Sequence, residues 1–307
     1  MSAMQPSSPN ADVAQRVPVA ADLEGPNHNG FVAGDRLGLA DQRREQIETL
    51  TVLVPTRNER GNIEPLLDRL SAVSGELHLK VLFVDDSDDG TPEVITRLSA
   101  VAACPVAVLH RPGKERTGGL AGAVRAGLTV TSSELVCVMD ADLQHPPELL
   151  TALVAEARRT NADVVVASRH GAGGDVTGFS TPRRALSRCS ELMARALFPR
   201  RLRGVSDPMS GFFVVRRAAV DTAALRPNGF KILIEILLSG PRLSLSEVGF
   251  HFGDRHFGES KASLREGSRY LRRLIALRVR GWNPAGKRSR TVAARVPIRP
   301  SSANESC

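Results

Sequence analysis

The chain has 307 residues, of which 42% are hydrophobic and 24% charged, as in a globular protein with one large domain or two small ones. Its four cysteines are scattered, without a Cys-x-x-Cys pair or histidines at zinc spacing, which argues against structural disulfides or zinc and for a reduced, cytoplasmic protein. We expect no signal peptide or membrane-spanning segment, and the net charge of +8 favours anionic ligands such as phosphates, a membrane surface or nucleic acid.

The first part of the chain lacks the pattern of a folded domain. Residues 1–46 are rich in Ala, Gly, Pro, Asn and Asp and show no sustained period, so we expect a disordered tail. The folded domain is expected to span residues 47–282. It begins with a buried strand at 50–55 and a helix with apolar residues at 63, 66, 67 and 70.

Two further strands and their helices continue the alternation. Residues 80–86 predict a second buried strand that ends in two acids, and turn and cap residues then precede a helix to about residue 98. A short strand is expected at 106–109. Residues 111–119 form a basic, glycine-containing loop before a helix of small residues at 120–128. This loop lacks P-loop spacing, and it is either an ordinary surface loop or a means of bringing backbone N–H groups and Lys114 to a diphosphate.

The most informative stretch is residues 136–147, where an apolar strand ends in two carboxylates. Side chains alternate along a strand, so Asp140 and Asp142 should point the same way from its C-terminal end, where open α/β sheets bind ligands. With the amide oxygen of Gln144 they form the all-oxygen ligand set that Mg²⁺ or Mn²⁺ prefers. The alternative is a solvated turn, with Asp142 as a helix cap and Pro146 and Pro147 at the start of the next helix. His145 is expected to be a turn or supporting residue and not a general base.

A helix at 146–159 and a strand at 163–168 complete the pattern of the first half. Alternating strands and helices predict an α/β fold, a doubly wound, mostly parallel sheet with helices on both faces. A dinucleotide-dependent oxidoreductase is disfavoured because no GxGxxG follows the first strand.

Six motifs occur in a fixed order along the chain. They are VPTRNE at 54–59, VDDSDDGT at 84–91, MDADLQHPP at 139–147, ASR at 167–169, SGF at 210–212 and GESK at 258–261. Together they resemble family 2 glycosyltransferases of the GT-A fold, on the branch of the dolichol-phosphate (polyprenyl-phosphate) mannose synthases. The resemblance covers roughly residues 50–280.

That resemblance implies an inverting, metal-dependent enzyme that moves a hexose from a nucleotide sugar to polyprenyl (dolichyl) phosphate. Mannose from GDP-mannose is the branch default. UDP-glucose or another donor stays open because Arg57 stands where many relatives have an aromatic residue, and a soluble sugar or protein acceptor is a second alternative. The implied donor residues are Pro55, Arg57, Glu59, Val84, Asp85, Asp86, Lys114 and Asp140. The implied metal ligands are Asp140, Asp142 and Gln144, and the implied acceptor-phosphate residues are Arg169, Arg183, Ser187 and Arg255. Asp140, Asp142, Arg169 and Arg255 are the expected catalytic residues.

A lipid-linked acceptor requires the enzyme to reach a bilayer, and we expect it to lie peripherally on the inner membrane face. On a helical wheel, residues 264–280 separate an arginine stripe from an apolar side that includes Leu274 and Ile275. Such a helix either anchors at anionic lipids or buries its apolar side on the sheet. Many relatives continue into transmembrane helices, so a separate membrane protein is a further hypothesis; the basic residues 283–307 are expected to be disordered. A basic nucleic-acid binder is the non-enzyme alternative, disfavoured by the clustered acids and the single Trp and Tyr.

Overall fold

The computed structural model describes residues 49–170, 190–226 and 231–250, together with six residues nearer the C-terminus, Arg272, Leu274, Ile275, Arg278, Arg295 and Val296. These residues belong to one compact unit, Ile47–Cys307. Arg183, Ser187 and Arg255, which the sequence implicates in acceptor binding, lie outside the described residues.

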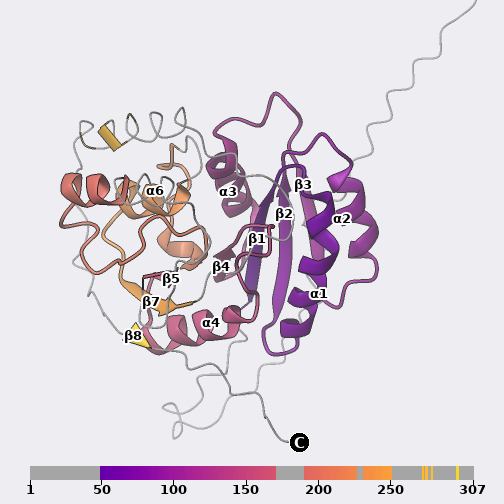
Figure 1. Ribbon diagram of the computed structural model, residues 1–307, viewed down its shortest axis with the longest axis horizontal. Coiled ribbons are helices and arrows are strands. Elements are labelled where there is room, and N and C mark those ends of the chain that lie inside the picture. Colours follow the sequence, from indigo (N-terminus) through magenta and orange to yellow (C-terminus); the bar gives the residue numbers. More distant parts are fainter. Residues whose placement is uncertain are drawn as a thin grey trace, which may run out of the picture. The chain divides into compact units, whose positions relative to one another are not determined.

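The described strands form one sheet in the order β3-β2-β1-β4-β6-β5-β7-β8 (Figure 1). β6 runs antiparallel to its neighbours β4 and β5, and the other pairs are parallel. A sheet of this kind confirms the predicted mostly parallel architecture. The strands are β1 (Leu50–Thr56), β2 (Leu79–Asp85), β3 (Val106–His110), β4 (Leu135–Val138), β5 (Val164–Ser168), β6 (Phe213–Arg216), β7 (Leu245–Gly249) and β8 (Arg295–Val296).

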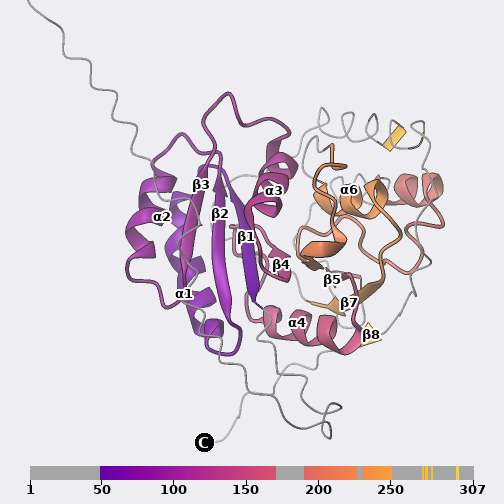
Figure 2. The ribbon, with the colours of Figure 1, turned by 180° about the vertical axis from the view of Figure 1, so that it is seen from behind.

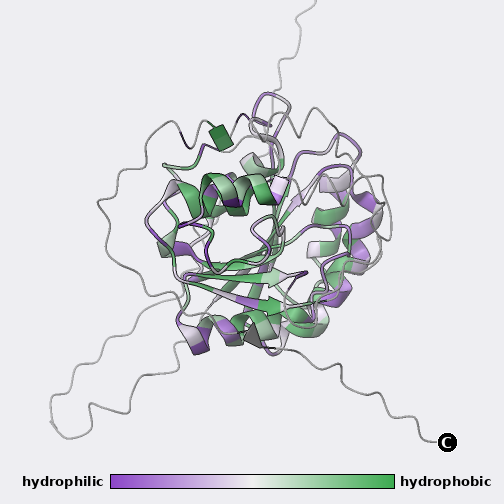
Figure 3. Cartoon of the chain, turned by 60° about the vertical axis from the view of Figure 1, so that its left-hand side comes forward, coloured by the Kyte–Doolittle hydropathy of each residue, from purple (hydrophilic) through white to green (hydrophobic). Residues whose placement is uncertain are grey.

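Helices cover both faces of the sheet, as Figures 1 and 2 show from opposite sides. One hydrophobic cluster joins α1 (Ile63–Ser74), α2 (Thr91–Ser99) and α4 (Leu149–Thr160) to the sheet. A second joins α3 (Gly119–Val130), α6 (Ile232–Ser239) and the helical residues 190–197 to the other face. Short 3₁₀ turns lie at Arg60–Asn62 (η1) and Arg217–Ala219 (η2). Several helices in Figure 3 carry both hydrophobic and hydrophilic colours, as expected when one side packs on a sheet.

The centre of the sheet is apolar on both faces, which explains the continuous hydrophobic run of β1. Every residue of β1 is buried. α3 approaches β1 and β2 closely because Gly127 has no side chain: a Cβ there would lie 2.4 Å from Cδ1 of Leu53 and 2.9 Å from Cγ2 of Val84. The small-residue helix predicted from the sequence therefore packs directly against the two strands that lead into the donor-side acids.

The structure corrects the predicted boundaries around the acidic motif. β4 ends at Val138, so Asp140 and Asp142 lie in the following loop and not on the strand itself, and α4 begins at Leu149, three residues after the predicted start. β6 and β7 were not predicted. Both are short, and the antiparallel insertion of β6 between β4 and β5 depends on long-range pairing that local periodicity does not encode.

Only parts of the C-terminal segment are described. Arg295 and Val296, from the stretch expected to be disordered, form β8 beside β7. The structure describes four residues of the predicted 264–280 helix, and all four are helical. The helical wheel places Leu274 and Ile275 on the same apolar side, but Leu274 is completely buried in the second hydrophobic cluster, whereas Ile275 is 47% exposed. Among the described residues, no helix combines the length and hydropathy needed to cross a bilayer.

Candidate active site

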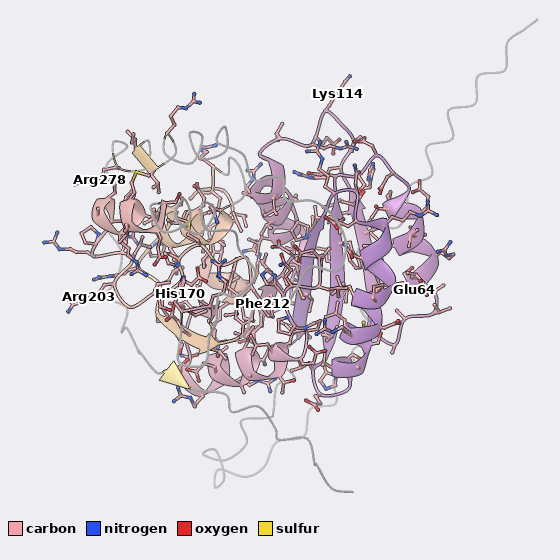
Figure 4. All side chains as sticks on the ribbon, viewed as in Figure 1. Glu64, Lys114, His170, Arg203, Phe212 and Arg278 are labelled. Atoms are coloured by element: carbon pink, nitrogen blue, oxygen red, sulfur yellow. The ribbon has the colours of Figure 1, made fainter. Side chains whose placement is uncertain are left out.

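The predicted functional residues gather at the edge of the sheet where its parallel strands end. β1, β2, β4 and β5 all run in the same direction, so the residues after each strand meet at that edge. Asp85 is the last residue of β2 and Asp86 follows it, the loop with Asp140 and Asp142 follows β4, and Arg169 follows β5. Figure 4 labels Phe212, which directly precedes β6, and His170, which follows Arg169.

Asp85, the last residue of β2, is fully buried. Its Oδ1 accepts hydrogen bonds from the hydroxyls of Thr56 and Ser87, at 2.8 and 2.5 Å. Its Oδ2 accepts one from the backbone N–H of Ser87 and lies 2.7 Å from Nδ1 of His110. With none of its surface exposed, this carboxylate ties the ends of β1, β2 and β3 together. A direct donor contact by Asp85 would require one of these bonds to be exchanged.

Asp86 forms a buried ion pair with Arg111, which the sequence analysis did not single out. Nε and Nη2 of Arg111 donate to the two carboxylate oxygens at 2.7 and 2.5 Å, and each side chain is only 7% exposed. The same guanidinium also donates to the carbonyl oxygens of Thr117 and Gly119. Arg111 thus joins a predicted donor residue to the basic loop and to the beginning of α3.

A second arginine fixes the basic loop. Arg116 donates to the carboxylate of Asp88 at 2.6 Å, to the carbonyl of Ser87 at 2.7 Å and to the carbonyl of Arg111 at 3.0 Å. Its hydrogen bond and charge lower the pKa of Asp88. Lys114 lies exposed at the outer end of this loop, and Figure 4 shows its side chain directed away from the sheet. The anchored loop with its exposed lysine is compatible with both readings left open above, an ordinary surface loop and a diphosphate-binding loop.

The remaining donor candidates after β1 differ in exposure. Pro55 and Val84 are buried, Arg57 is exposed, and Glu59 is partly exposed. Oε2 of Glu59 accepts a hydrogen bond from Nδ2 of the buried Asn62 at 2.7 Å. Arg57 and Glu59 therefore offer polar groups to a ligand, whereas Pro55 and Val84 shape the strand ends that carry them.

The acidic motif forms a tight loop whose conformation is set by its own residues. Oδ1 of Asp142 accepts a hydrogen bond from the backbone N–H of Gln144 at 3.2 Å, and the intervening Leu143 adopts a positive φ of 63°. The Asp140 side chain is 38% exposed, whereas Asp142 as a residue is only 7% exposed. One carboxylate is accessible and the other is largely enclosed.

His145 stabilises this loop through a hydrogen bond and aromatic packing. Its Nδ1 accepts a hydrogen bond from the backbone N–H of Asp140 at 3.1 Å, and its ring stacks on Phe212 with centroids 5.1 Å apart and meets the edge of Phe250. Burial lowers the pKa of His145 to about 4, so the ring is neutral at physiological pH. Its role as a supporting residue, predicted from the sequence, is consistent with these contacts.

Gly211, from the SGF motif, lies against the acidic loop. A Cβ at this position would be 3.1 Å from Oδ2 of Asp140 and 3.3 Å from Cε1 of His145. The absence of a side chain lets the segment before β6 approach the acidic loop closely.

Arg169 forms an ion pair with Asp207, which, like Arg111, the sequence analysis did not single out. Nε and Nη2 of Arg169 donate to Oδ2 and Oδ1 of Asp207 at 2.7 and 2.9 Å. Burial alone would lower the pKa of Arg169, but the hydrogen bonds and charge of Asp207, with smaller contributions from Glu191 and Asp140, raise it. Arg169 therefore stays cationic beside the acidic loop. The two residues are 38 positions apart in the sequence, so no local pattern predicts that they pair. The one sequence feature that points to Asp207 as a site residue is its place three residues before the SGF motif.

The donor set at Asp140, Asp142 and Gln144 suits a hard divalent cation, because all three side chains offer oxygen. Within residues 49–170, 190–226 and 231–250, no group of three or more His, Cys, Asp or Glu side chains is arranged to hold a metal ion. The third predicted ligand is the amide of Gln144.

A sheet of this order, with helices on both faces and acids at one edge, has the architecture of the GT-A fold. Solved structures support the fold. Mannosyl-3-phosphoglycerate synthase from Rubrobacter xylanophilus is similar at a TM-score of 0.53 and 21% identity, over 77% of this chain and 75% of that one. Glucosyl-3-phosphoglycerate synthase from Mycobacterium tuberculosis, in complex with Mn²⁺, UDP-glucose and phosphoglyceric acid, is similar at 0.52 and 19%, over 76% and 79%.

The family model described as Glycosyl transferase family 2 matches residues 51–223, more than half of the chain. The chain belongs to this family. It is 39% identical over 229 residues to a dolichol-phosphate mannosyltransferase of Pyrococcus furiosus, over 74% of this chain but only 63% of that protein's length. It is 36% identical over 242 residues to the dolichol-phosphate mannosyltransferase of Saccharomyces cerevisiae, over 75% and 86%. The resemblance read from the motifs is confirmed, and membership of an enzyme family argues against the nucleic-acid-binding alternative.

Proposed function

We propose that this protein transfers mannose from GDP-mannose to polyprenyl (dolichyl) phosphate at the cytoplasmic face of a membrane. The observation that carries the proposal is the arrangement at one sheet edge: the loop with the accessible carboxylate of Asp140 follows β4, and the cation Arg169 follows β5, which runs in the same direction. A metal-bound diphosphate and an anionic acceptor need this combination of opposite charges side by side. The names of the relatives from Pyrococcus furiosus and Saccharomyces cerevisiae support the choice of mannose and of a lipid phosphate.

Asp140, Asp142 and Gln144 hold Mg²⁺ or Mn²⁺ in this proposal, and their all-oxygen chemistry fits either ion. The ion, when bound, stabilises the negative charge that develops on the departing nucleoside diphosphate. The hydrogen bonds from Gln144 N–H to Asp142, and from Asp140 N–H to His145, keep the loop in one conformation. The chain's own contribution is a preformed ligand loop that needs little reorganisation.

The donor's base and ribose lie beside the ends of β1 and β2. Arg57 and Glu59 are accessible to them. Asp86, whose carboxylate is oriented by Arg111, retains lone pairs beyond the two hydrogen bonds that it accepts from that arginine. Lys114, exposed on the anchored loop, adds positive charge for the diphosphate.

Arg169 binds the acceptor phosphate, together with Arg183, Ser187 and Arg255 from outside the described residues. A phosphate monoester, with a second pKa of about 6, is already largely ionised at neutral pH and needs no strong general base. His145 is unsuited to that role, since its Nδ1 accepts the Asp140 N–H and burial keeps its pKa low. Direct displacement by the acceptor oxygen inverts the anomeric configuration.

The protein attaches peripherally to the membrane through its basic C-terminal helix. Arg272, Ile275 and Arg278 are exposed, and anionic headgroups attract arginine side chains at a bilayer surface. Leu274 packs on the fold and secures the helix from the other side. Helix 264–280 in this arrangement combines both roles that the sequence left open.

The function is tested by incubating the purified protein with Mn²⁺ or Mg²⁺, polyprenyl phosphate and a panel of radiolabelled nucleotide sugars. We expect a metal-dependent mannolipid from GDP-mannose, lost in Asp142→Ala and retained in Asp68→Ala, which alters an exposed acid on α1. A lipid product formed only from another nucleotide sugar would replace mannose in the proposal and leave polyprenyl phosphate as the acceptor. Absence of lipid product from every donor, with transfer to a soluble sugar or protein, would overturn the lipid acceptor.

A further inference from the structure

Asp207 fixes both the position and the plane of the Arg169 guanidinium. Two parallel hydrogen bonds, at 2.7 and 2.9 Å, join the guanidinium to the two carboxylate oxygens, and the backbone N–H of Arg169 points at Oδ2 from 3.4 Å. The Asp207 side chain is 1% exposed and that of Arg169 is 15% exposed. A two-point contact of this kind restricts rotation of the guanidinium, which a single hydrogen bond would allow.

Glu247 in turn holds the backbone that carries Asp207. It lies on β7, in register with Val166 of β5, and is 6% exposed. Its Oε1 accepts hydrogen bonds from the backbone N–H groups of Ser206 and Asp207, at 2.5 and 3.4 Å. The hydroxyl of Ser206 also bonds to that of Ser168, at 2.5 Å. Residues 206 and 207 are thereby joined to the end of β5 and to the middle of β7.

The helical residues 190–197 also bind the segment 205–206. Nη2 of Arg195 donates to the carbonyl oxygens of Val205 and Ser206, at 2.5 and 2.9 Å, and Arg195 is itself paired with Glu191. The segment before Asp207 is therefore fixed by bonds from three separate elements.

The charges of Asp207 and Asp140 both act on Arg169. Burial would raise the pKa of Asp207, but its hydrogen bond to Arg169 and the charge of that arginine lower it, so Asp207 remains ionised. The charge of Asp140, the accessible carboxylate of the proposed metal loop, also contributes to the raised pKa of Arg169.

We propose that Asp207, supported by Glu247, is a positioning residue that orients Arg169 toward the anionic acceptor. The proposal rests on the function proposed above. Asp207 does not touch the acceptor; it supplies the fixed guanidinium that does. Loss of its charge should leave Arg169 present but free to change rotamer, so acceptor binding weakens while donor binding does not.

Steady-state kinetics and donor calorimetry on Asp207→Asn test the proposal. We expect the KM for polyprenyl phosphate to rise about 10–100-fold, since a fixed, charge-assisted contact is lost, while the dissociation constant of GDP with Mn²⁺ stays within about twofold. Asp207→Glu should restore part of the acceptor affinity. In an Arg169→Lys background, Asp207→Asn should have little further effect, because the group that it positions is gone.

Glu156→Gln is the matched control. Glu156 is also a buried carboxylate that takes two hydrogen bonds from an arginine, Arg159, but it lies on α4 away from Arg169. An equal rise in acceptor KM in this control, or an unchanged KM in Asp207→Asn, would overturn the positioning role. So would additive effects of Asp207→Asn and Arg169→Lys.

Nuclear magnetic resonance of the arginine Nε–H groups separates this proposal from the proposed function. In the wild type we expect a slowly exchanging Arg169 signal that shifts when inorganic phosphate is added; Asp207→Asn should lose both the slow exchange and the shift. That result supports the positioning role even if the wild type transfers no sugar to a lipid. A signal that is equally protected in both proteins would overturn it whatever the acceptor.

Discussion

The carboxylate of Asp86 and the guanidinium of Arg111 form a two-point ion pair that is almost completely buried, with oxygen–nitrogen distances of 2.7 and 2.5 Å. One residue follows β2 and the other follows β3, so the pair connects adjacent strand ends at the donor side of the site. The arginine also reaches the carbonyls of Thr117 and Gly119. The proposed donor residue Asp86 and the conformation of the basic loop are therefore linked through one side chain.

Arg111→Ala should destabilise the fold and weaken nucleotide binding together. Removal of one partner leaves a buried carboxylate unpaired, which costs about 3–5 kcal/mol. At about 2–4 °C per kcal/mol, the melting temperature should fall by roughly 6–20 °C. The dissociation constant of GDP, measured by calorimetry below that temperature, should rise at least about tenfold, equivalent to about 1.4 kcal/mol.

Arg69→Ala is the control for this variant. Arg69 makes a similar two-point contact with Glu148, but its side chain is 36% exposed and that of Glu148 is 56% exposed. An exposed pair contributes only about 0–1 kcal/mol. Equal losses of stability in the two variants would show that burial does not set the importance of the Asp86–Arg111 pair.

Gly211→Ala should impair the metal loop without unfolding the protein. The added Cβ would lie 3.1 Å from Oδ2 of Asp140, so that carboxylate has to move by a few tenths of an ångström. We expect a rise of about tenfold in the Mn²⁺ concentration needed for half-maximal activity, or about 1.4 kcal/mol of lost binding. Gly240→Ala, where no atom lies within 4 Å of the new Cβ, should leave this value unchanged.

His145→Phe should separate the hydrogen bond of His145 from its aromatic packing. A phenyl ring preserves the stack on Phe212 but cannot accept the N–H of Asp140, which costs about 1–3 kcal/mol if that group is left unsatisfied. We expect weaker Mn²⁺-dependent nucleotide binding, measured by calorimetry with and without the ion, and little change in metal-free binding. Unchanged metal dependence would mean that the hydrogen bond does not support the loop.

Glu247→Gln should make stability less sensitive to pH. Burial raises the pKa of Glu247, so the folded state keeps this proton at a pH where the unfolded chain, with an ordinary glutamate pKa of about 4.3, has lost it. This group's contribution is therefore full below that ordinary pKa and is lost as the pH rises through the raised value. A glutamine keeps an oxygen for the N–H groups of Ser206 and Asp207 without this penalty.

Urea unfolding of both proteins at several pH values measures this effect. The free energy of unfolding of Glu247→Gln minus that of the wild type should increase from about pH 4.3 upward and then level off. The depressed pKa of Asp207 acts in the opposite direction, with stability lost as the pH falls, but that residue is present in both proteins. A difference independent of pH would contradict a raised pKa for Glu247.

Tertiary structure decided the contacts that make these residues a site. Arg111 lies 25 positions from Asp86, and Asp207 lies 38 from Arg169. Neither pairing leaves a periodic trace in the sequence, because each depends on which strand ends adjoin in the sheet. β6, four residues long, lies between β4 and β5 through hydrogen bonds to both, and its position brings Gly211 against Asp140.

The sequence by itself determined the fold class, the family and the identity of the acids at the strand ends. Continuous apolar runs such as that of β1 reveal strands buried on both faces, and helices with a stripe of apolar residues reveal one buried side; both patterns are local. The pairing, burial and orientation of the charged side chains came only from the three-dimensional arrangement. An ion pair is determined by distance in space, and the distance along the chain between Arg169 and Asp207 contains no information about it.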